Sequence, residues 1–423
     1  MMPLTTLPSV RQARNSEQSL LPILQDEIRA AGRISFDRFM ELCLYHPQLG
    51  YYNSGDLRLG KAGDYYTSAH VAPVFARLLA RHLERSWRAR GEQPSFELIE
   101  LGPGDGLLAS ELLSWMARRY PELFSCLHYT GVEQSEYLRK RLEEVLMPFA
   151  DRSRIVADWD RVLPFTAIRA ATGSRGPRHI PMCWGGGRER GRVSTSPADT
   201  HRTQSSQRFV LANEFFDALP FHLLVWRDGA WKERYVCLEA GRLAWCEGDP
   251  SSPELSRQAE SRFAPGLPLS EREDGWIAEI TPRAAEWMKR ISEFLSHGEA
   301  LIIDYGYTLE EWQQGRFPRG TALAYRRHQA IDDVLASPGD QDITAHVNFS
   351  QLIEVGKSAG MVLQCIESQV RFLMQLGEED QFREIFENCG SELERLRRAQ
   401  LLKTLILPQG MGETFRVLGM ARS

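Results

Sequence analysis

Three glycines, Gly102, Gly104 and Gly106, directly follow a short apolar segment and directly precede a helical pattern. Glycine allows positive φ and close approach of the backbone to a ligand. The first N–H groups of the following helix would face the polar end of a bound nucleotide. This pattern predicts a cofactor site, with a purely structural tight turn as the alternative. The predicted contacts in this segment are Glu100, Gly102, Pro103, Gly104 and Gly106.

Acidic residues follow the next two predicted strands. Glu133 ends the first, where a carboxylate can accept hydrogen bonds from both hydroxyls of a ribose. A nicotinamide cofactor uses an acid at the same place, so Glu133 alone favours neither cofactor class. After the other strand, Asp158 could bind the amino group of an adenine and Trp159 could lie against its ring. The alternatives are a solvated carboxylate at Glu133 and a core position for Trp159.

Asn213, Glu214 and Asp217 form a third group, at the end of the fourth predicted strand. Carboxyl ends of strands in an open α/β sheet face the ligand crevice, so we expect these side chains beside the reacting group. Acids there can orient or polarise a guanidinium or an amine, and group transfer depends largely on such positioning. The three residues are therefore the predicted catalytic residues. In the alternative interpretation, Asn213 caps a turn and Asp217 is solvated.

Strand-like runs alternate with helical patterns around these residues, which predicts an α/β, Rossmann-like fold with a mostly parallel central sheet. Two amphipathic helices are predicted within 20–44, another over 71–87, one after Gly106 that Pro121 stops, and one that starts at Pro282. The predicted strands are 96–101, 128–133, 154–156, 209–213 and 300–304.

The chain divides into three predicted parts. Residues 1–19 form a flexible N-terminus, and 20–90 a helical and aromatic-loop region that covers the cofactor site. Residues 91–423 form the Rossmann-like domain. Within it we expect a flexible, Arg-rich insert over 172–207, a β-rich elaboration over 221–280 and a substrate-side loop over 306–350.

The amino-acid composition restricts which partners the protein is expected to bind. The 423 residues are 43% hydrophobic and 25% charged with a net charge of −5, which predicts a globular enzyme without overall attraction to nucleic acid or anionic lipid. Seven cysteines are scattered without zinc-ligand spacing, so we predict no metal site. No apolar run approaches the roughly 20 residues of a membrane span. We therefore expect a location in the cytoplasm if the protein is bacterial, or in the mitochondrial matrix if it is eukaryotic.

Several ordered sequence blocks resemble the MidA family of methyltransferases, over most of the chain from about Ile34 onward. The matching blocks are Tyr45 to Tyr52, Gly63 to Ser68, Glu100 to Gly106, Asn213 to Pro220, Ile303 to Gly306 and Asp342 to Phe349.

The resemblance implies a class I methyltransferase fold with S-adenosyl-L-methionine as cofactor and a protein as substrate. In mitochondrial members it implies symmetric dimethylation of an arginine on the complex I subunit of about 49 kDa. By matching position, Gly102, Gly104 and Glu133 would contact the cofactor, and the block with Asp64, Tyr66 and Thr67 would close over it. Asp342, Thr344 and His346 would belong to a loop that shapes the acceptor site. Internal hydrogen bonding, with His346 a packed histidine, is the alternative for that loop.

The chain departs from the family at Asp105, where a small residue or arginine is usual, and in the insert 172–207. A nucleic-acid methyltransferase is disfavoured, because Glu214 replaces part of an Asn-Pro-Pro-aromatic segment and its charge would repel phosphate. A nicotinamide oxidoreductase and a cofactor-binding assembly factor without turnover remain as alternatives.

Overall fold

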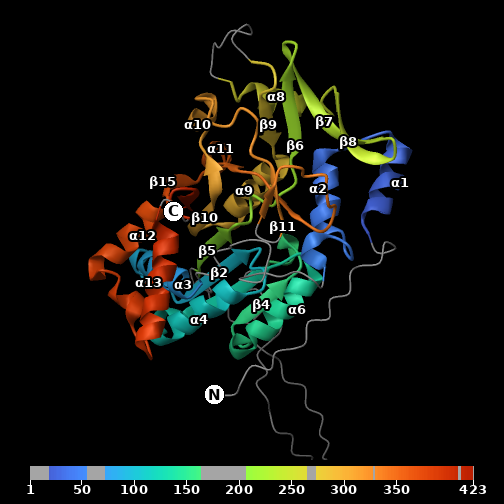
Figure 1. Ribbon diagram of the computed structural model, residues 1–423. Helices are drawn as coiled ribbons and strands as arrows, with labels where there is room; N and C mark the ends of the chain where they lie inside the picture. The colour runs from blue at the N-terminus through green and yellow to red at the C-terminus, as the bar shows by residue number, and fades with distance from the viewer. Residues whose placement is uncertain are drawn as a thin grey trace, which may run out of the picture.

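The computed structural model describes residues 19–54, 72–162, 206–263, 273–326, 329–407 and 411–422 (Figure 1). The predicted cofactor contacts Asp64, Tyr66 and Thr67 lie outside these ranges, as do nearly all of the predicted insert 172–207 and of the predicted N-terminus 1–19.

A mostly parallel sheet forms the centre of the described structure and confirms the predicted fold class. Its strand order is β15-β16-β10-β5-β2-β3-β4, with β14 paired to β10. Only β16 runs against the rest, because it is antiparallel to both β10 and β15. All five predicted strands are present, as β2 (Ser95–Leu101), β3 (Leu127–Val132), β4 (Ser153–Val156), β5 (Ser206–Asn213) and β10 (Gly298–Tyr307). The sheet also contains three strands that were not predicted, β14 (Val347–Asn348), β15 (Val362–Ser368) and β16 (Phe415–Arg422).

Helices cover both faces of this sheet. Alternate residues of β2 point to opposite sides, so Leu98 packs into one core and Ile99 into the other. The Leu98 side is covered by α3 (Ala72–Ala89), α4 (Leu107–Arg119), α12 (Gln369–Gly377) and α13 (Glu392–Ile406). The Ile99 side is covered by α9 (Pro282–Phe294) and α11 (Phe349–Ser358). Burial on both faces explains why every residue of β2 is buried, including Ser95, Glu97 and Glu100.

Helix boundaries follow local signals. As predicted, α9 begins at Pro282. α4 ends at Arg119, just before Pro121 as predicted, and Pro121 also occupies the first turn of α5 (Pro121–Cys126). Proline suits that position because its missing N–H would have no partner there anyway. Ser135 caps α6 (Glu136–Val145) by accepting from the N–H of Leu138.

The predicted β-rich elaboration is a second sheet, with β6 (His222–Arg227), β7 (Ala230–Glu239), β8 (Arg242–Gly248) and β9 (Ile277–Ile280). Its remaining strand, β1 (Ile34–Ser35), lies between the two predicted N-terminal helices, α1 (Leu21–Ala31) and α2 (Phe36–Tyr45). Phe36 and Phe39 of α2 are fully buried in the core that these elements share. In Figure 1, α1 and α2 lie beside β7 and β8. This packing fixes α2 in the molecule.

A third small sheet carries the predicted substrate-side loop. It has the order β12-β11-β13, from β11 (Leu323–Arg326), β12 (Gln329–Ile331) and β13 (Asp342–Thr344). The short helices α8 (Pro253–Glu260) and α10 (Leu309–Gln313) complete the described helices, together with five 3-10 turns among which η2 (Tyr51–Asn53) and η5 (Trp159–Arg161) border the site described below.

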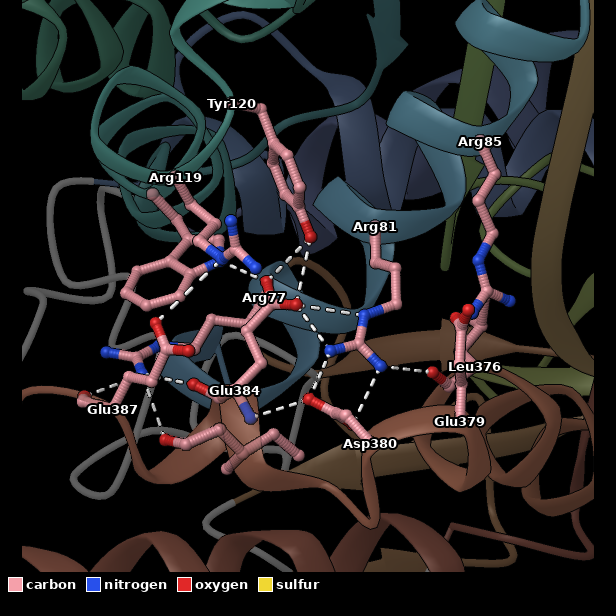
Figure 2. Close-up of polar contacts among 12 residues, drawn as sticks. Arg77, Arg81, Arg85, Arg119, Tyr120, Leu376, Glu379, Asp380, Glu384 and Glu387 are labelled. Atoms are coloured by element: carbon pink, nitrogen blue, oxygen red, sulfur yellow. Dashed lines mark hydrogen bonds and ion pairs between the residues drawn. The ribbon is translucent and has the colours of Figure 1, made fainter.

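Charged side chains attach the segment with Asp380 and Glu384 to helices α3 and α4 (Figure 2). The carboxylate of Glu384, which is 3% exposed, accepts hydrogen bonds from the Arg81 guanidinium, from Tyr120 Oη and from Trp115 Nε1. Arg81 also donates two hydrogen bonds to Asp380. Because Trp115 belongs to α4, this network holds the helix that follows the Gly-rich turn.

Candidate active site

A cavity of about 640 Å³ opens where β2, β3, β4, β5 and β10 end. Its size falls within the usual range for small-molecule and cofactor sites. Ten of the predicted site residues line it: Glu100, Gly102, Pro103, Gly104, Glu133, Asp158, Trp159, Asn213, Glu214 and Asp217. Residues separated by more than a hundred positions in sequence thus meet at one edge of the sheet, as expected for an open α/β fold.

Positive φ values shape the Gly-rich turn, with 61° at Gly102, 59° at Gly104 and 78° at Gly106. Gly106 does not line the cavity. A Cβ there would overlap the side chain of Leu142, so this glycine serves the close packing of α4 on α6. Gly102 is where the backbone approaches the cavity wall, because a Cβ on it would lie 3.0 Å from Cδ2 of Phe215.

Glu133 is tied to this turn. Its carboxylate accepts hydrogen bonds from the N–H of Gly104 (3.2 Å) and from the N–H of Ser135 (2.9 Å). The residue is only 7% exposed, so the alternative of a solvated carboxylate is wrong. Burial raises the pKa of Glu133 to about 7, and the two backbone donors oppose this rise. Glu133 is therefore a fixed acceptor facing the cavity.

A second buried acid lies beneath the turn. Glu100 is 2% exposed and accepts a hydrogen bond from Tyr129 Oη at 2.7 Å. Burial raises its pKa to about 7 as well. The tyrosine holds one carboxylate oxygen, so the orientation of Glu100 is set from inside the sheet.

Asp158 and Trp159 border the far side of the cavity. Asp158 caps η5 by accepting from the N–H of Arg161, and its side chain is half exposed. Trp159 is 9% exposed and makes edge contacts with Trp287 and Phe294, at 5.8 and 5.2 Å between ring centroids. Trp159 thus belongs to the core and also lines the cavity, which joins the two interpretations that the sequence left open.

Carboxyl groups gather at the ends of β5 and β10. Glu214 has a left-handed φ of 50°, an uncommon backbone conformation for glutamate that turns the chain sharply after β5. Asp304 is fully buried and accepts from the N–H groups of Phe216 and Asp217, at 3.0 and 3.3 Å. These bonds place Asp217 at the cavity wall.

Burial and neighbouring negative charges both raise the pKa values of Asp217 and Asp304. Asp217 is 5% exposed, so the solvated alternative is wrong for it too. Burial raises its pKa to about 7, and Glu214 adds to the rise. The pKa of Asp304 is raised by burial first and then by the charges of Asp217 and Glu214. A cation in the cavity would stabilise the ionised forms of all three.

Several lining residues were not predicted as site residues. Tyr45 of α2 donates to the carbonyl of Ala218 at 2.8 Å, and Tyr52 of η2 donates to Asp342 at 2.8 Å. These tyrosines and Asp342 lie within blocks that carried the family resemblance, so position within those blocks was the available signal. The other unpredicted lining residues include Glu41, Tyr51, Arg139, Arg283, Trp287, Arg290 and Tyr305.

Only part of the predicted substrate-side loop reaches the cavity. Asp342 lines the cavity, whereas Thr344 is 4% exposed and His346 is packed between Tyr305 and Phe317, both away from the lining. The structure thus favours the packed-histidine interpretation. Among the described residues, no group of three or more His, Cys, Asp or Glu could hold a metal ion, and no helix is long and apolar enough to cross a membrane.

Sheet order, Gly-rich turn and the acid after the second strand together define a Rossmann-like enzyme that binds a nucleotide-type cofactor. Comparison with known proteins identifies its family. A family model described as "Putative S-adenosyl-L-methionine-dependent methyltransferase" matches residues 78–366. The chain belongs to this family, and it is a methyltransferase that uses S-adenosyl-L-methionine.

Relatives cover nearly the whole chain. Protein arginine methyltransferase NDUFAF7, mitochondrial, from Danio rerio is 30% identical, over 96% of this chain and 88% of its own length. The Homo sapiens protein of that name is 26% identical, over 96% of this chain and 84% of its own length. A Burkholderia thailandensis structure, described as a "likely methyl transferase" bound to S-adenosyl-homocysteine, is 28% identical with a TM-score of 0.77, over 99% of this chain and 95% of that one.

The residues at the cavity fit this cofactor. Glu133 offers a fixed acceptor for ribose hydroxyls, and the raised pKa values of Asp217 and Asp304 are those of acids that a cation would stabilise. A side chain at Gly102 would press against Phe215, which also lines the cavity.

Proposed function

We propose that this protein methylates an arginine side chain of a protein substrate, with the acids after β5 and β10 forming the acceptor side of the cavity. The observation that carries the proposal is an acid cluster in which Asp217 and Asp304 are buried and the partly buried Glu214 raises the pKa of both. Curated relatives named protein arginine methyltransferases support it, because they match 96% of the chain. By analogy with those relatives, a complex I subunit is the first protein acceptor to test.

The proposed roles follow from position. Glu133 binds the ribose, Asp158 and Trp159 border the adenine, and the turn from Glu100 to Gly104 lies against the remainder of the cofactor. S-adenosylmethionine, when bound, supplies an electrophilic methyl group. Asn213 and Glu214 orient the acceptor guanidinium, whose position relative to the methyl group governs the rate.

Asp217 accepts the proton that is released. A guanidinium remains a monocation after methylation, so it loses one proton for each methyl group that it gains. Asp217 must be ionised to accept this proton, and its pKa is about 7. We therefore expect kcat/KM to rise with pH through about 7, where the carboxyl ionises.

Transfer of a labelled methyl group tests the proposal. The purified protein is incubated with methyl-labelled S-adenosylmethionine and a purified complex I subunit, and the acid hydrolysate is analysed for methylarginine. Gly104→Val, at a φ of 59°, should abolish labelling, whereas Gly229→Val, at a φ of 77° in an exposed turn with open space around it, is the matched control. Tight cofactor binding without label on any protein would instead favour an assembly factor without turnover.

A further inference from the structure

His346 belongs to a sequence block that resembles the family, yet it does not line the cofactor cavity. Its orientation is nevertheless fixed. Its backbone N–H donates to Thr321 Oγ1 at 2.9 Å, and its ring lies 5.8 Å from the ring of Tyr305 and 5.2 Å from that of Phe317. Burial lowers the pKa of His346 to about 4, so the imidazole is neutral near pH 7.

A second, much smaller cavity lies between His346 and Asp217. Its volume of about 10 Å³ corresponds to one water molecule. Asp217 lines this small cavity and also the large one, so it forms part of the wall between them. Thr281, Asn348 and Gln351 add polar groups to the lining, which gives a water the two to four partners that it needs.

Two buried polar atoms belong to residues lining the small cavity. Within the described residues, Oδ1 of Asp217 and Nδ1 of His346 are buried without a hydrogen-bond partner. Leaving such an atom unsatisfied costs about 1–3 kcal/mol, so buried groups of this kind are normally satisfied by protein or by ordered water. The two segments are also joined directly, because the N–H of Ala345 donates to the carbonyl of Asp217 at 3.2 Å.

We propose that one water in the small cavity joins Nδ1 of His346 to Oδ1 of Asp217, and that His346 is thereby a positioning residue for methyl transfer. The inference rests on the proposed role of Asp217 as proton acceptor. A neutral imidazole with its proton on Nδ1 donates to the water, which in turn donates to the carboxylate. This arrangement stabilises the ionised carboxylate from behind, while Tyr305 and the large cavity share its other side.

Other groups near Asp217 and His346 act on the same ionisation, and a test must hold them constant. The acids and tyrosines around Asp217 and the arginines whose charges reach this region are Glu214, Asp304, Tyr305, Tyr45, Tyr52, Tyr325, Asp342, Arg283 and Arg316. Substitution of His346 alone leaves every one of them in place.

The test compares His346→Phe with His346→Asn. Phenylalanine keeps the packing of the ring but cannot donate, so it should move the acid limb of the kcat/KM profile to higher pH by about one unit. Asparagine places an amide near Nδ1, so it should restore the limb to its wild-type position. The control is Phe317→Leu, which loosens the packing of His346 but keeps its Nδ1, and which should not move the limb.

The proposal is overturned if the acid limb of the kcat/KM profile does not move in His346→Phe. It is also overturned if the limb moves as far in His346→Asn as in His346→Phe. If His346→Phe does not fold, as judged by circular dichroism, His346→Gln replaces it, because its longer amide reaches the Nε2 position instead.

A binding measurement separates this inference from the proposed function. S-adenosylmethionine affinity is followed by calorimetry against pH, since a sulfonium binds better to ionised Asp217 whether or not a protein acceptor exists. As the pH is lowered, the affinity for S-adenosylmethionine should begin to fall at a higher pH in His346→Phe than in wild type. Absence of methylarginine with this shift present would reject only the proposed function; absence of the shift would reject the role of His346.

Discussion

Replacing Glu133 by glutamine should weaken cofactor binding and, at the same time, stabilise the free protein. Glu133→Gln keeps the shape of the side chain and one oxygen acceptor but removes the charge. Hydrogen bonds to charged groups contribute about 1.5–3 kcal/mol, so losing the charged acceptor of the ribose should cost about 2 kcal/mol. This corresponds to a roughly 30-fold rise in the Kd for S-adenosylmethionine.

The stabilising effect follows from the pKa. Folding raises the pKa of Glu133 from an ordinary 4.5 to about 7. A carboxyl with a raised folded-state pKa disfavours folding increasingly as pH rises from about 4.5 to about 7, and fully above that. At about 1.4 kcal/mol for each pKa unit, the ionised form costs about 3 kcal/mol at pH 8. Glutamine avoids this cost, so the variant should unfold at higher denaturant concentration than wild type at pH 8 and at an equal concentration below pH 4.5.

Calorimetry gives the affinity, and urea unfolding at pH 4.5 and pH 8 gives the stability. The matched control is Glu136→Gln, an exposed carboxylate three residues away that pairs with Lys140, which should leave both quantities unchanged. The reasoning is refuted if Glu133→Gln binds S-adenosylmethionine within threefold of wild type, or if the variant is the less stable protein at pH 8.

Three further substitutions test the site and its support. Asp217→Asn should lower the single-turnover rate constant by about 100-fold because the proton acceptor is lost, while the Kd for S-adenosylmethionine rises far less because only one of the negative charges near the sulfonium is removed. Gly106→Ala should destabilise the protein by about 2–4 kcal/mol in urea, since backbone strain and overlap add, against about 1 kcal/mol for Gly241→Ala, which has the same φ of 78° but open space. Arg81→Met leaves a buried carboxylate unpaired and should cost about 3–5 kcal/mol, whereas Arg85→Met at an exposed pair should have no measurable effect.

Features that depend on neighbouring residues in sequence were predictable. The strands that end at Leu101 and Asn213 contain short apolar stretches, Leu98–Ile99 and Phe209–Ala212, and the Gly-rich turn is recognisable from its residue types. Pro121 shows what such signals leave open, because a proline that ends one helix can also begin the next, and only the path of the chain shows that it does so here.

Features that depend on pairing at long range were not predictable. Asp304 is part of an apolar run and gives no local sign that it accepts from the backbone of a segment nearly ninety residues earlier. Tyr45 and Tyr52 reach the cavity only because α2 is fixed to the second sheet through β1. The burial of Glu133 and Asp217 likewise arises from the assembled fold, since nothing in their own sequence neighbourhoods distinguishes a buried acid from a solvated one.

The acid cluster of Glu214, Asp217 and Asp304 also discriminates between the two cofactor classes that Glu133 alone could not separate. A nicotinamide dinucleotide brings a negatively charged pyrophosphate, whereas S-adenosylmethionine brings a sulfonium cation. Negative charge at Glu214 already raises the pKa of Asp217, and Glu214 and Asp217 together raise that of Asp304, so a further anion nearby would raise both pKa values more and would itself be repelled. A cation has the opposite effect, because it lowers these pKa values and recovers part of the free energy that burial of the carboxylates costs. The electrostatics of this cavity therefore favour a cationic cofactor and a cationic acceptor, both of which arginine methylation supplies.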